Sequence, residues 1–322
     1  MKRIILASIN YSFWDMSLYR NVVWFLKGRK EYTRAGYEAA AKDFSKEDLN
    51  VDCKGRTFVI TGANSGIGKC VALEAAKRGG TVHMVCRNPQ FAETAKNEIV
   101  EASGNQDVHV HILDLSLPRN VLKFAKEFRD SINQCNVLVN NAGCMVNERK
   151  VDADGLEKNF ATNTLGTHIL TKTLFPLLKK SDKPRVVTVS SGGMLVQKLC
   201  ADDLQFEKMT PFDGTMAYAQ NKRQQVVMTE MYAKEDPEIH FSVMHPGWAD
   251  TPAVRSAMPD FYEKMKNSLR TPEQGADTAV WLAISEKALN HPNGLFFQDR
   301  TPVATHLPLA WTKSSEEEKQ AF

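Results

Sequence analysis

The sequence lacks the features that mark a secreted, zinc-binding or nucleic-acid-binding protein. Its six cysteines form no C-x-x-C pair, and several lie inside apolar runs. We therefore expect buried thiols in a reducing, cytoplasmic environment rather than a disulfide framework or a metal site. The formal net charge is only +3, and no segment is dense in Lys and Arg, so nucleic acid is not expected as a partner.

Long apolar segments are also absent. The N-terminal run at 4–7 is too short for the apolar region of a signal peptide, and Met16 is an alternative to Met1 as the start. From Ser17, apolar and basic residues recur at helical spacing over roughly three turns, well short of the ~20 apolar residues that span a bilayer. Two interpretations stay open for this helix: it packs on the main domain, or it lies peripherally on an intracellular membrane.

The remaining pattern divides the chain into three parts. Residues 1–50 are expected to form an N-terminal helical extension, with a second short helix at 33–44. Residues 51–310 alternate apolar strand patterns with helical patterns, which predicts one α/β domain. Residues 311–322, rich in Ser, Glu and Lys, are expected to be a flexible tail.

The first strand of the domain, at 56–61, runs into a glycine-rich turn and then a helix. The residues of the turn that we expect to bind a cofactor are Gly62, Asn64, Ser65, Gly66, Ile67 and Gly68. A strand, a glycine-rich turn and a helix in this order begin a dinucleotide-binding unit, whose helix N-terminus presents free N–H groups to a pyrophosphate. The spacing G-x-x-x-G-x-G also suits a purely structural turn, but its position after a strand favours binding.

Two side chains at the ends of later strands indicate which dinucleotide is bound. Arg87 directly follows the strand at 81–86, where an acidic residue would bind a ribose 2′-hydroxyl and an Arg accommodates a 2′-phosphate. This favours NADP (NADPH) over NAD, the alternative being that Arg87 is only a solvated loop charge. Asp114, after the strand at 108–113, is expected to contact the adenine or to cap a helix before Pro118.

Small and amide residues follow the strand at 136–140. The backbone of Asn141, Ala142 and Gly143 is expected to lie against the cofactor, while the side chains of Asn140 and Asn141 brace neighbouring strands. Structural bracing is favoured over direct chemistry for these amides.

Four polar residues in the second half of the domain are candidates for catalysis. Asn163 interrupts an apolar helical pattern at 156–178, and the strand at 185–191 ends in a hydroxyl pair, of which Ser191 is our candidate. Tyr218 and Lys222 are four residues apart on a predicted helix and therefore share one face. A nearby cation favours the phenolate, so Tyr218 is a candidate general acid/base, although this spacing alone is common on surface helices.

Taken together, these motifs resemble the short-chain dehydrogenase/reductase family over about residues 55–300. The family pattern T-G-x-x-x-G-x-G matches 61–68, N-N-A-G matches 140–143, and Y-x-x-x-K matches Tyr218 and Lys222. Asn221 departs from the pattern, because many members carry Ser before the Lys.

The resemblance implies a role for each candidate residue. Tyr218 would be the general acid/base, and Lys222 would bind the nicotinamide ribose and lower the pKa of Tyr218. Ser191 would donate a hydrogen bond to the substrate carbonyl oxygen, and Asn163 would hold a water in a proton relay past Lys222. The loop after the sixth strand would surround the nicotinamide through Pro246, Gly247 and Thr251. His245, just before this loop, is expected to be structural.

These inferences predict a Rossmann-type doubly wound parallel sheet and an NADP-dependent oxidoreductase. The substrate class implied is a hydrophobic alcohol or carbonyl compound, such as a retinoid, steroid or lipid aldehyde. The apolar residues that either line the substrate site or pack a lid onto the domain are Met194, Leu195, Trp248, Val254, Met258, Phe261, Tyr262 and Met265. The rival function is a cofactor-binding regulator or scaffold that keeps the fold without turnover.

Overall fold

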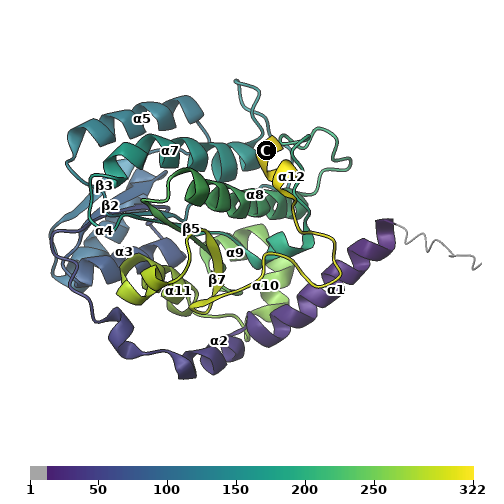
Figure 1. Cartoon of the computed structure of the whole chain (residues 1–322), viewed down its shortest axis with the longest axis horizontal. Helices are drawn as coiled ribbons and strands as arrows, with labels where there is room; N and C mark the ends of the chain where they lie inside the picture. The colour runs from purple at the N-terminus through teal and green to yellow at the C-terminus, as the bar shows by residue number, and fades with distance from the viewer. Residues whose placement is uncertain (1–12) are drawn as a thin grey trace, which may run out of the picture.

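The computed structural model describes residues 13–322, which form one eight-stranded sheet between two layers of helices (Figure 1). The strands are β1 (Thr57–Thr61), β2 (Thr81–Cys86), β3 (Val108–Ile112), β4 (Val137–Asn140), β5 (Arg185–Val189), β6 (His240–Met244), β7 (Leu295–Gln298) and β8 (Thr301–Pro302). Their order is β3-β2-β1-β4-β5-β6-β7-β8. Strands β1 to β7 are parallel, and β8 joins the edge antiparallel. The predicted Rossmann-type sheet is confirmed, with β8 as an unpredicted addition.

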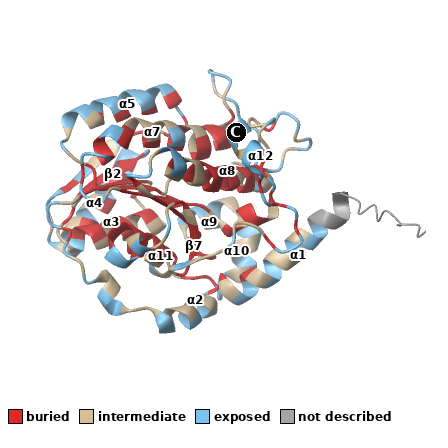
Figure 2. Ribbon diagram, in the orientation of Figure 1, coloured by how far each residue is buried: buried red, intermediate tan, exposed pale blue. Residues whose placement is uncertain are grey.

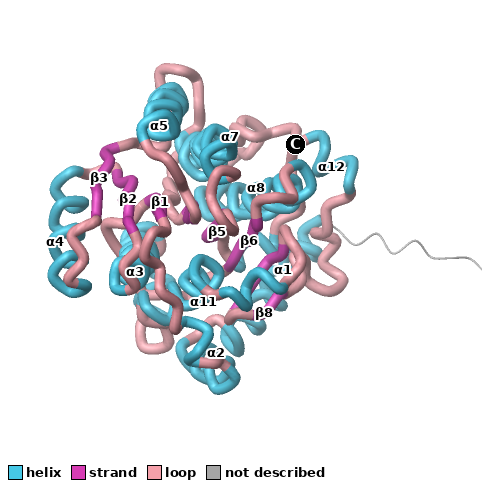
Figure 3. The backbone as a smooth tube through the Cα atoms, turned by 60° about the vertical axis from the view of Figure 1, so that its left-hand side comes forward, coloured by secondary structure: helices cyan, strands magenta, loops and turns pink. Residues whose placement is uncertain are grey.

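Helices cover both faces of this sheet, which buries its central strands completely. One face carries α3 (Gly66–Lys77), α4 (Pro89–Ser103) and α11 (Pro272–Ile284), and the other carries α5 (Pro118–Ser131), α7 (Thr167–Leu178) and α8 (Gly214–Glu235) (Figures 1 and 3). Every residue of β1, β4 and β5 is buried, as the red core of Figure 2 shows. Strands that are buried on both faces appear in a sequence as nearly continuous apolar runs, and their positions could therefore be predicted well.

The predicted helix at 156–178 is found as a continuous helical segment over 158–178, which contains a π-helical turn. A short helix, α6 (Lys158–Phe160), leads into a π-helical turn (Ala161–Gly166) before α7 begins. Gly166 lies so close to the preceding loop that a Cβ there would stand 2.2 Å from the carbonyl oxygen of Leu115. The helical pattern thus predicted the segment but not the π-helical turn, in which Asn163 lies and which is a feature that is frequent at functional sites.

The N-terminal extension contains α1 (Phe13–Glu31) and α2 (Arg34–Ala40), followed by 3₁₀ turns at Ala41–Asp43 and Lys46–Leu49. Helix α1 begins earlier than predicted and runs along the side of the domain (Figure 1). The short apolar run at 4–7 lies outside the described residues. Within 13–322, no helix combines the length and apolar character needed to cross a bilayer.

Short helices follow β5, β6, α11 and β8. They are a 3₁₀ turn at Gly192–Val196, α9 (Pro252–Ala257), α10 (Pro259–Met265), a 3₁₀ turn at Glu286–Asn290 and α12 (Glu316–Ala321). The segment expected to be a flexible tail thus contains α12, which differs from our prediction. Its N-terminus is closed by a capping box between Ser315 and Glu318, and Lys319 pairs with Glu230 of α8 at 2.8 Å. A capped, ion-paired helix is more ordered than its Ser, Glu and Lys composition indicates.

The prediction of buried thiols holds for three of the six cysteines. All six cysteines are free, and Cys53, Cys86 and Cys135 are buried while the other three are partly exposed. In the described part of the chain, no cluster of His, Cys, Asp or Glu is arranged to hold a metal ion.

Candidate active site

A cavity of about 420 Å³ opens at the carboxyl ends of the parallel strands. The sequence-predicted residues that line it are Gly62, Asn64, Ser65, Gly66, Ile67, Arg87, Asp114, Asn141, Ala142, Gly143, Ser191, Tyr218, Lys222, Pro246, Gly247 and Thr251. Gly68 and Asn163 are not part of the wall and lie behind it. The sheet topology explains this convergence, because each loop leaves the same edge of a parallel sheet.

The glycine-rich turn has the geometry of a phosphate-binding loop. Gly62 and Gly66 have positive φ values of 64° and 52°, which side chains other than glycine rarely adopt. Ser65 is the N-cap of α3, yet its hydroxyl makes no capping hydrogen bond, so it and the first N–H groups of the helix are available to a ligand. This turn fits the pyrophosphate of a dinucleotide.

Gly68 fixes the packing behind that turn. A Cβ on this residue would lie 2.4 Å from Nδ2 of Asn141 and 2.5 Å from the backbone oxygen of Gly62, which cannot move without moving the turn. We expect Gly68→Ala to lower the free energy of unfolding by about 1–3 kcal/mol, the usual cost of overpacking. Chemical denaturation measures this change.

Gly193→Ala is the matched control for that substitution. An added Cβ there meets only the Ser191 hydroxyl, at 3.5 Å, and the backbone φ is not positive. Its free energy of unfolding should stay close to that of the wild type. If the two variants are equally stable, the turn can accept a side chain at position 68, and the close contacts found there do not limit it.

Arg87 and Asp114 flank the far end of the cavity. Arg87 is exposed directly after β2, and no ion pair or hydrogen bond engages its guanidinium within residues 13–322. Asp114 accepts hydrogen bonds through Oδ1 from the backbone N–H and the hydroxyl of Ser116, at 2.9 and 2.8 Å. Leu117, not Asp114, is the N-cap of α5, so the alternative of a helix cap is wrong. Asp114 lines the cavity, and its second carboxylate oxygen forms no hydrogen bond within residues 13–322.

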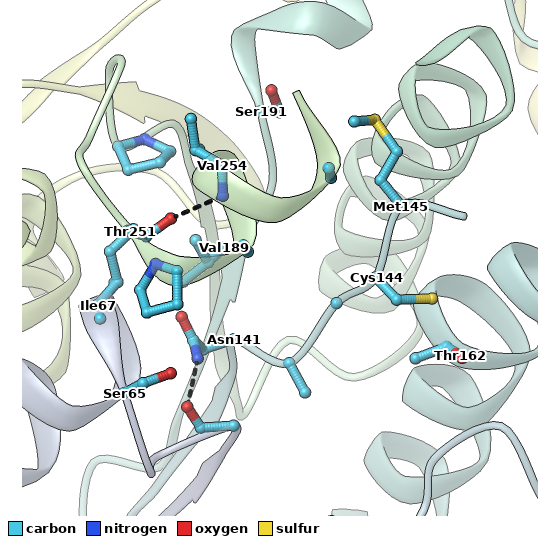
Figure 4. Close-up of a pocket in the computed structure, with 18 of the residues that line it drawn as sticks. Ser65, Ile67, Asn141, Cys144, Met145, Thr162, Val189, Ser191, Thr251 and Val254 are labelled. Atoms are coloured by element: carbon cyan, nitrogen blue, oxygen red, sulfur yellow. Dashed lines mark hydrogen bonds between the residues drawn. The ribbon is translucent and has the colours of Figure 1, made fainter. Parts of the chain in front are cut away.

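The two amides after β4 brace the sheet at this edge. Asn141 donates to the backbone oxygens of Thr61 at 2.9 Å and of Gly62 at 3.2 Å, which ties the loop after β4 to the end of β1; the bond to Gly62 is drawn in Figure 4. Asn140 donates to the hydroxyl of Thr171 on α7 at 2.9 Å. Both contacts are of the structural kind expected from the sequence.

The two hydroxyls that end β5 have different environments. Ser190 is buried and donates to the backbone oxygen of Lys222 at 2.9 Å, so its hydrogen is committed. Ser191 accepts a hydrogen bond from the N–H of Gly193 at 3.1 Å, which leaves its own hydrogen available to a ligand in the cavity. This geometry favours Ser191 as the donor to a substrate oxygen.

Tyr218 and Lys222 enter the cavity from α8. The helix begins at an Asp213 cap, and its four-residue spacing stacks the two side chains, with Nζ of Lys222 5.3 Å from the centre of the Tyr218 ring. Nζ also donates to the backbone oxygen of Val189 at 2.8 Å and to Oε1 of Gln225 at 3.0 Å. Lys222 is thereby held at the end of β5, in the same cavity as Ser191.

The protonation of this pair differs from what the resemblance implies. Burial raises the pKa of the Tyr218 phenol well above its ordinary value, and the neighbouring Cys144 acts in the same direction. Burial also lowers the pKa of Lys222 to about 8. The expected lowering of the Tyr218 pKa is therefore not found in the protein alone. The physical reason is that both groups are withdrawn from water, which disfavours the phenolate and the ammonium alike.

Asn163 acts on the cavity through the backbone of Cys144. Its Oδ1 accepts from the N–H of Cys144, and its Nδ2 donates to the oxygen of the same residue, both at 2.8 Å. Nδ2 also donates to Oδ1 of Asn221 at 3.2 Å. The polar task expected of Asn163 thus includes fixing the loop after β4.

Several wall residues were not predicted. Cys144, Met145 and Thr162 form the side of the cavity opposite Thr251 and Val254 (Figure 4). Loop residues of this kind carry no periodic pattern, and only the neighbouring N-N-A-G motif pointed to the region.

The apolar residues expected at the substrate site divide into two groups. Trp248, Val254 and Met258 line the cavity. Phe261, Tyr262 and Met265 pack instead around Trp248 and Tyr32. Met194 and Leu195 belong to the 3₁₀ turn after β5 and pack into the core, so the alternative that they line the substrate site is wrong.

Helix α1 supports the cavity from outside. Nε1 of Trp24 donates to the backbone oxygen of Gly192 at 2.7 Å, one residue after Ser191. The N–H of the same Gly192 donates to Nδ1 of the buried His245, whose ring stacks edge-on against Tyr32. Burial lowers the pKa of His245 well below its ordinary value, so the imidazole stays neutral and accepts this bond. The segment after Ser191 is therefore clamped from two sides.

Comparisons with known proteins agree with this geometry. A family model described as short chain dehydrogenase matches residues 56–201. Human dehydrogenase/reductase SDR family member 12 is 62% identical over 306 residues, covering 94% of this chain and 96% of that protein. The segments SSGGMLVQKL, YAQNKRQQVV and HPGWADTP of this chain suggest the same likeness.

More distant relatives extend the picture. Human retinol dehydrogenase 11 is 35% identical over 253 residues, 77% of this chain and 79% of that protein. The crystal structure of a putative short chain dehydrogenase from Escherichia coli CFT073 complexed with NADPH shares the fold, with a TM-score of 0.63 and 24% identity, over 80% of this chain and 100% of that one.

Proposed function

The chain belongs to the short-chain dehydrogenase/reductase family of oxidoreductases, and on that premise we propose that it uses NADPH to interconvert a carbonyl and an alcohol on a hydrophobic small molecule. The observation that carries the proposal is that Ser191, Tyr218 and Lys222 line the same cavity as the glycine-rich turn. A phosphate-binding turn and a proton donor in one cavity suit hydride transfer to a carbonyl carbon.

Each residue has a defined task in the reduction direction. When bound, the nicotinamide supplies the hydride that reaches the carbonyl carbon. The hydroxyl of Ser191 donates a hydrogen bond to the carbonyl oxygen, and the phenol of Tyr218 transfers its proton to that oxygen. Because its pKa is raised, Tyr218 is fully protonated at neutral pH and holds the proton ready. The ammonium of Lys222, stacked on the ring, favours the phenolate that remains.

The cofactor preference rests on the end of β2. The exposed Arg87 can pair with a ribose 2′-phosphate, and no acidic side chain stands there to bind a free 2′-hydroxyl. The Escherichia coli structure is a complex with NADPH, which supports the same preference. The rest of the cofactor would lie along the glycine-rich turn and the loop at 246–251.

The apolar wall supports a hydrophobic substrate. Met145, Trp248, Val254 and Met258 face the cavity around the hydroxyl of Ser191. Relatives at 35% identity are named for retinol, an apolar alcohol. We therefore assign the substrate to the class of retinoids, steroids and lipid aldehydes, with the reacting oxygen at Ser191 and Tyr218 and the apolar body along this wall.

A substrate panel tests the proposal. NADPH consumption by the full chain is followed by nicotinamide absorbance with apolar aldehydes and ketones, and with sugars as polar carbonyl controls. Turnover of the apolar compounds with little of the sugars is expected. The absence of reduction of every carbonyl, despite measurable NADPH binding, would favour the cofactor-binding regulator instead. The four polar residues argue against that alternative, since a scaffold needs none of them.

A surface next to α1 supports peripheral membrane contact. The exposed apolar face of α1 consists of Leu18, Val22, Phe25 and Leu26, and Leu309 and Trp311 are exposed on the C-terminal loop. Leu309 and Trp311 are 79% and 77% exposed, and the C-terminal loop that carries them is tied to α1 by a bond from Arg20 to the backbone oxygen of Ala310 at 2.7 Å. Arg29 and Lys30 are exposed at the end of the same helix. An apolar face beside cations suits a membrane that contains anionic lipid.

Vesicle flotation tests the membrane contact. We expect the full chain to float with phosphatidylcholine vesicles that contain phosphatidylserine, and Leu18→Ser with Leu26→Ser to reduce the bound fraction severalfold. The control is Leu117→Ser with Leu122→Ser, which removes exposed apolar side chains near and on α5. If both double variants float like the wild type, the surface does not bind lipid.

A further inference from the structure

Gln225 is buried on α8, one turn after Lys222, and the proposed reaction gives it no task. Its Oε1 accepts a hydrogen bond from Nζ of Lys222 at 3.0 Å. Its Nε2 donates to the backbone oxygen of Asn163 at 2.8 Å. The side chain is 1% exposed, so the amide has no water-filled alternative conformation. It forms a bridge from the ammonium to the π-helical turn.

The partners fix the orientation of this amide. An ammonium can only donate, and a carbonyl oxygen can only accept. Exchanging the oxygen and the nitrogen of Gln225 would place two donors against each other at Lys222 and two acceptors at Asn163. The bridge is therefore complementary at both ends.

Lys222 has few other groups to support its charge. Its second acceptor is the backbone oxygen of Val189, at 2.8 Å. The titratable groups that face it are Tyr218 on its own helix and Cys144 on the loop after β4, and both are neutral at neutral pH because burial raises their pKa values. Within the described chain, no carboxylate forms an ion pair with Lys222. A buried ammonium held only by neutral acceptors depends on each of them.

We propose that Gln225 is the positioning residue of Lys222: it occupies the place that the family resemblance gives to a relay water and keeps the ammonium charged and aimed into the cavity. An amide retains both of its hydrogens, so it orients Lys222 rather than passing a proton on. The consequence for catalysis rests on the proposed function, since it requires that Lys222 act in hydride transfer. The effect of Gln225 on the protonation of Lys222 does not rest on the proposed function.

The protonation of Lys222 can be measured without turnover. In the cofactor-free full chain labelled with ¹³C-lysine, the Cε signal of Lys222 should titrate near 8, well below ordinary lysines at about 10.4. Its absence in Lys222→Met assigns the signal. Gln225→Met keeps the size of the side chain but removes the acceptor, and we expect the pKa of Lys222 to fall by about one unit. Gln225→Glu places a carboxylate there, and we expect a rise of about one unit.

Gln224→Met is the matched control. Gln224 is 0% exposed on the same helix, and its amide oxygen accepts from Thr164 and Asn221 rather than from Lys222. Its loss should lower stability while the Lys222 titration stays at the wild-type value. Opposite shifts for the two Gln225 variants are not expected of a residue that only fills space. If all three variants titrate within about 0.3 unit of the wild type, Gln225 does not support the ammonium.

The pH profile of kcat/KM tests whether the effect of Gln225 on Lys222 matters for catalysis. If the reaction needs charged Lys222, activity is present below its pKa and is lost as the pH rises through it. The alkaline limb should then move to lower pH in Gln225→Met and to higher pH in Gln225→Glu. If the wild type turns over and these limbs do not move, the catalytic part of the inference is wrong. If no carbonyl is reduced even by the wild type, the proposed function fails, and the lysine titration still decides the role of Gln225.

Discussion

Tyr218→Phe is expected to reduce kcat for carbonyl reduction by about 10²–10⁴-fold, the range that general acid–base catalysis contributes. The substitution removes one oxygen and keeps the ring that stacks on Lys222 at 5.3 Å, so the fold and the lysine position should persist. NADPH affinity should change little, because the pyrophosphate and 2′-phosphate sites are formed by other residues. Steady-state kinetics and calorimetric NADPH binding on the same preparation measure both quantities.

Tyr232→Phe is the control for that result. Tyr232 lies on the same helix, is buried, and its hydroxyl contacts Nδ1 of His168 at 2.6 Å, away from the residues that line the cavity. Its loss should lower the free energy of unfolding by about 1 kcal/mol and leave kcat unchanged. Equal rates for wild type and Tyr218→Phe would remove the phenol from the mechanism. Equal losses in the two Phe variants would point to a disturbed helix instead.

The fold was largely predictable because its strands are local patterns. Residues 57–61 and 185–189 are buried on both faces, and apart from Arg185 each strand appears in the sequence as an uninterrupted apolar or β-branched run. The order of strands and helices then restricts the topology to a few arrangements. β8 escaped prediction because it has only two residues, Thr301 and Pro302, and is defined by pairing with β7.

Features stabilised by distant contacts were not predictable. The π-helical turn at Asn163 depends on a backbone partner, Cys144, nineteen residues earlier. Helix α12 depends on Glu230 and on its own capping box, so composition alone indicated a tail. The contacts with Cys144 and Glu230 arise only after the chain is folded, whereas the S-x-x-E spacing at 315–318 is a local helix-start signal that the composition argument overlooked.

The candidate site was predictable where motifs carry the chemistry and not where packing does. The glycine-rich turn, Ser191, Tyr218 and Lys222 all line one cavity, as the motifs implied. Trp24 was missed because it is separated by 168 residues from the backbone oxygen that it binds at Gly192. This contact makes the N-terminal extension part of the site: α1 presents an apolar face outward and holds the segment after Ser191 inward.

Arg87→Asp is expected to weaken NADPH binding by about 10–150-fold, which corresponds to about 1.5–3 kcal/mol for hydrogen bonds to a charged group. NADH binding should change far less, and the new carboxylate can accept from the ribose 2′-hydroxyl. The physical reason is local, since Arg87 is exposed at the end of β2 and is engaged by no other side chain within residues 13–322. Calorimetric titration of NADPH and of NADH into the full chain, for the wild type and for the variant, measures how much each affinity changes.

Lys123→Asp is the control that distinguishes a local contact of Arg87 with the 2′-phosphate from an effect of the protein's net charge. Lys123 is on α5, its side chain is 76% exposed, and the substitution changes the net charge by the same amount. At physiological salt the Debye length is about 8 Å, so a distant charge should alter NADPH affinity only slightly. If Arg87→Asp weakens NADPH and NADH equally, Arg87 does not contact the 2′-phosphate. If Lys123→Asp weakens NADPH as much as Arg87→Asp does, the preference comes from overall charge rather than from the end of β2.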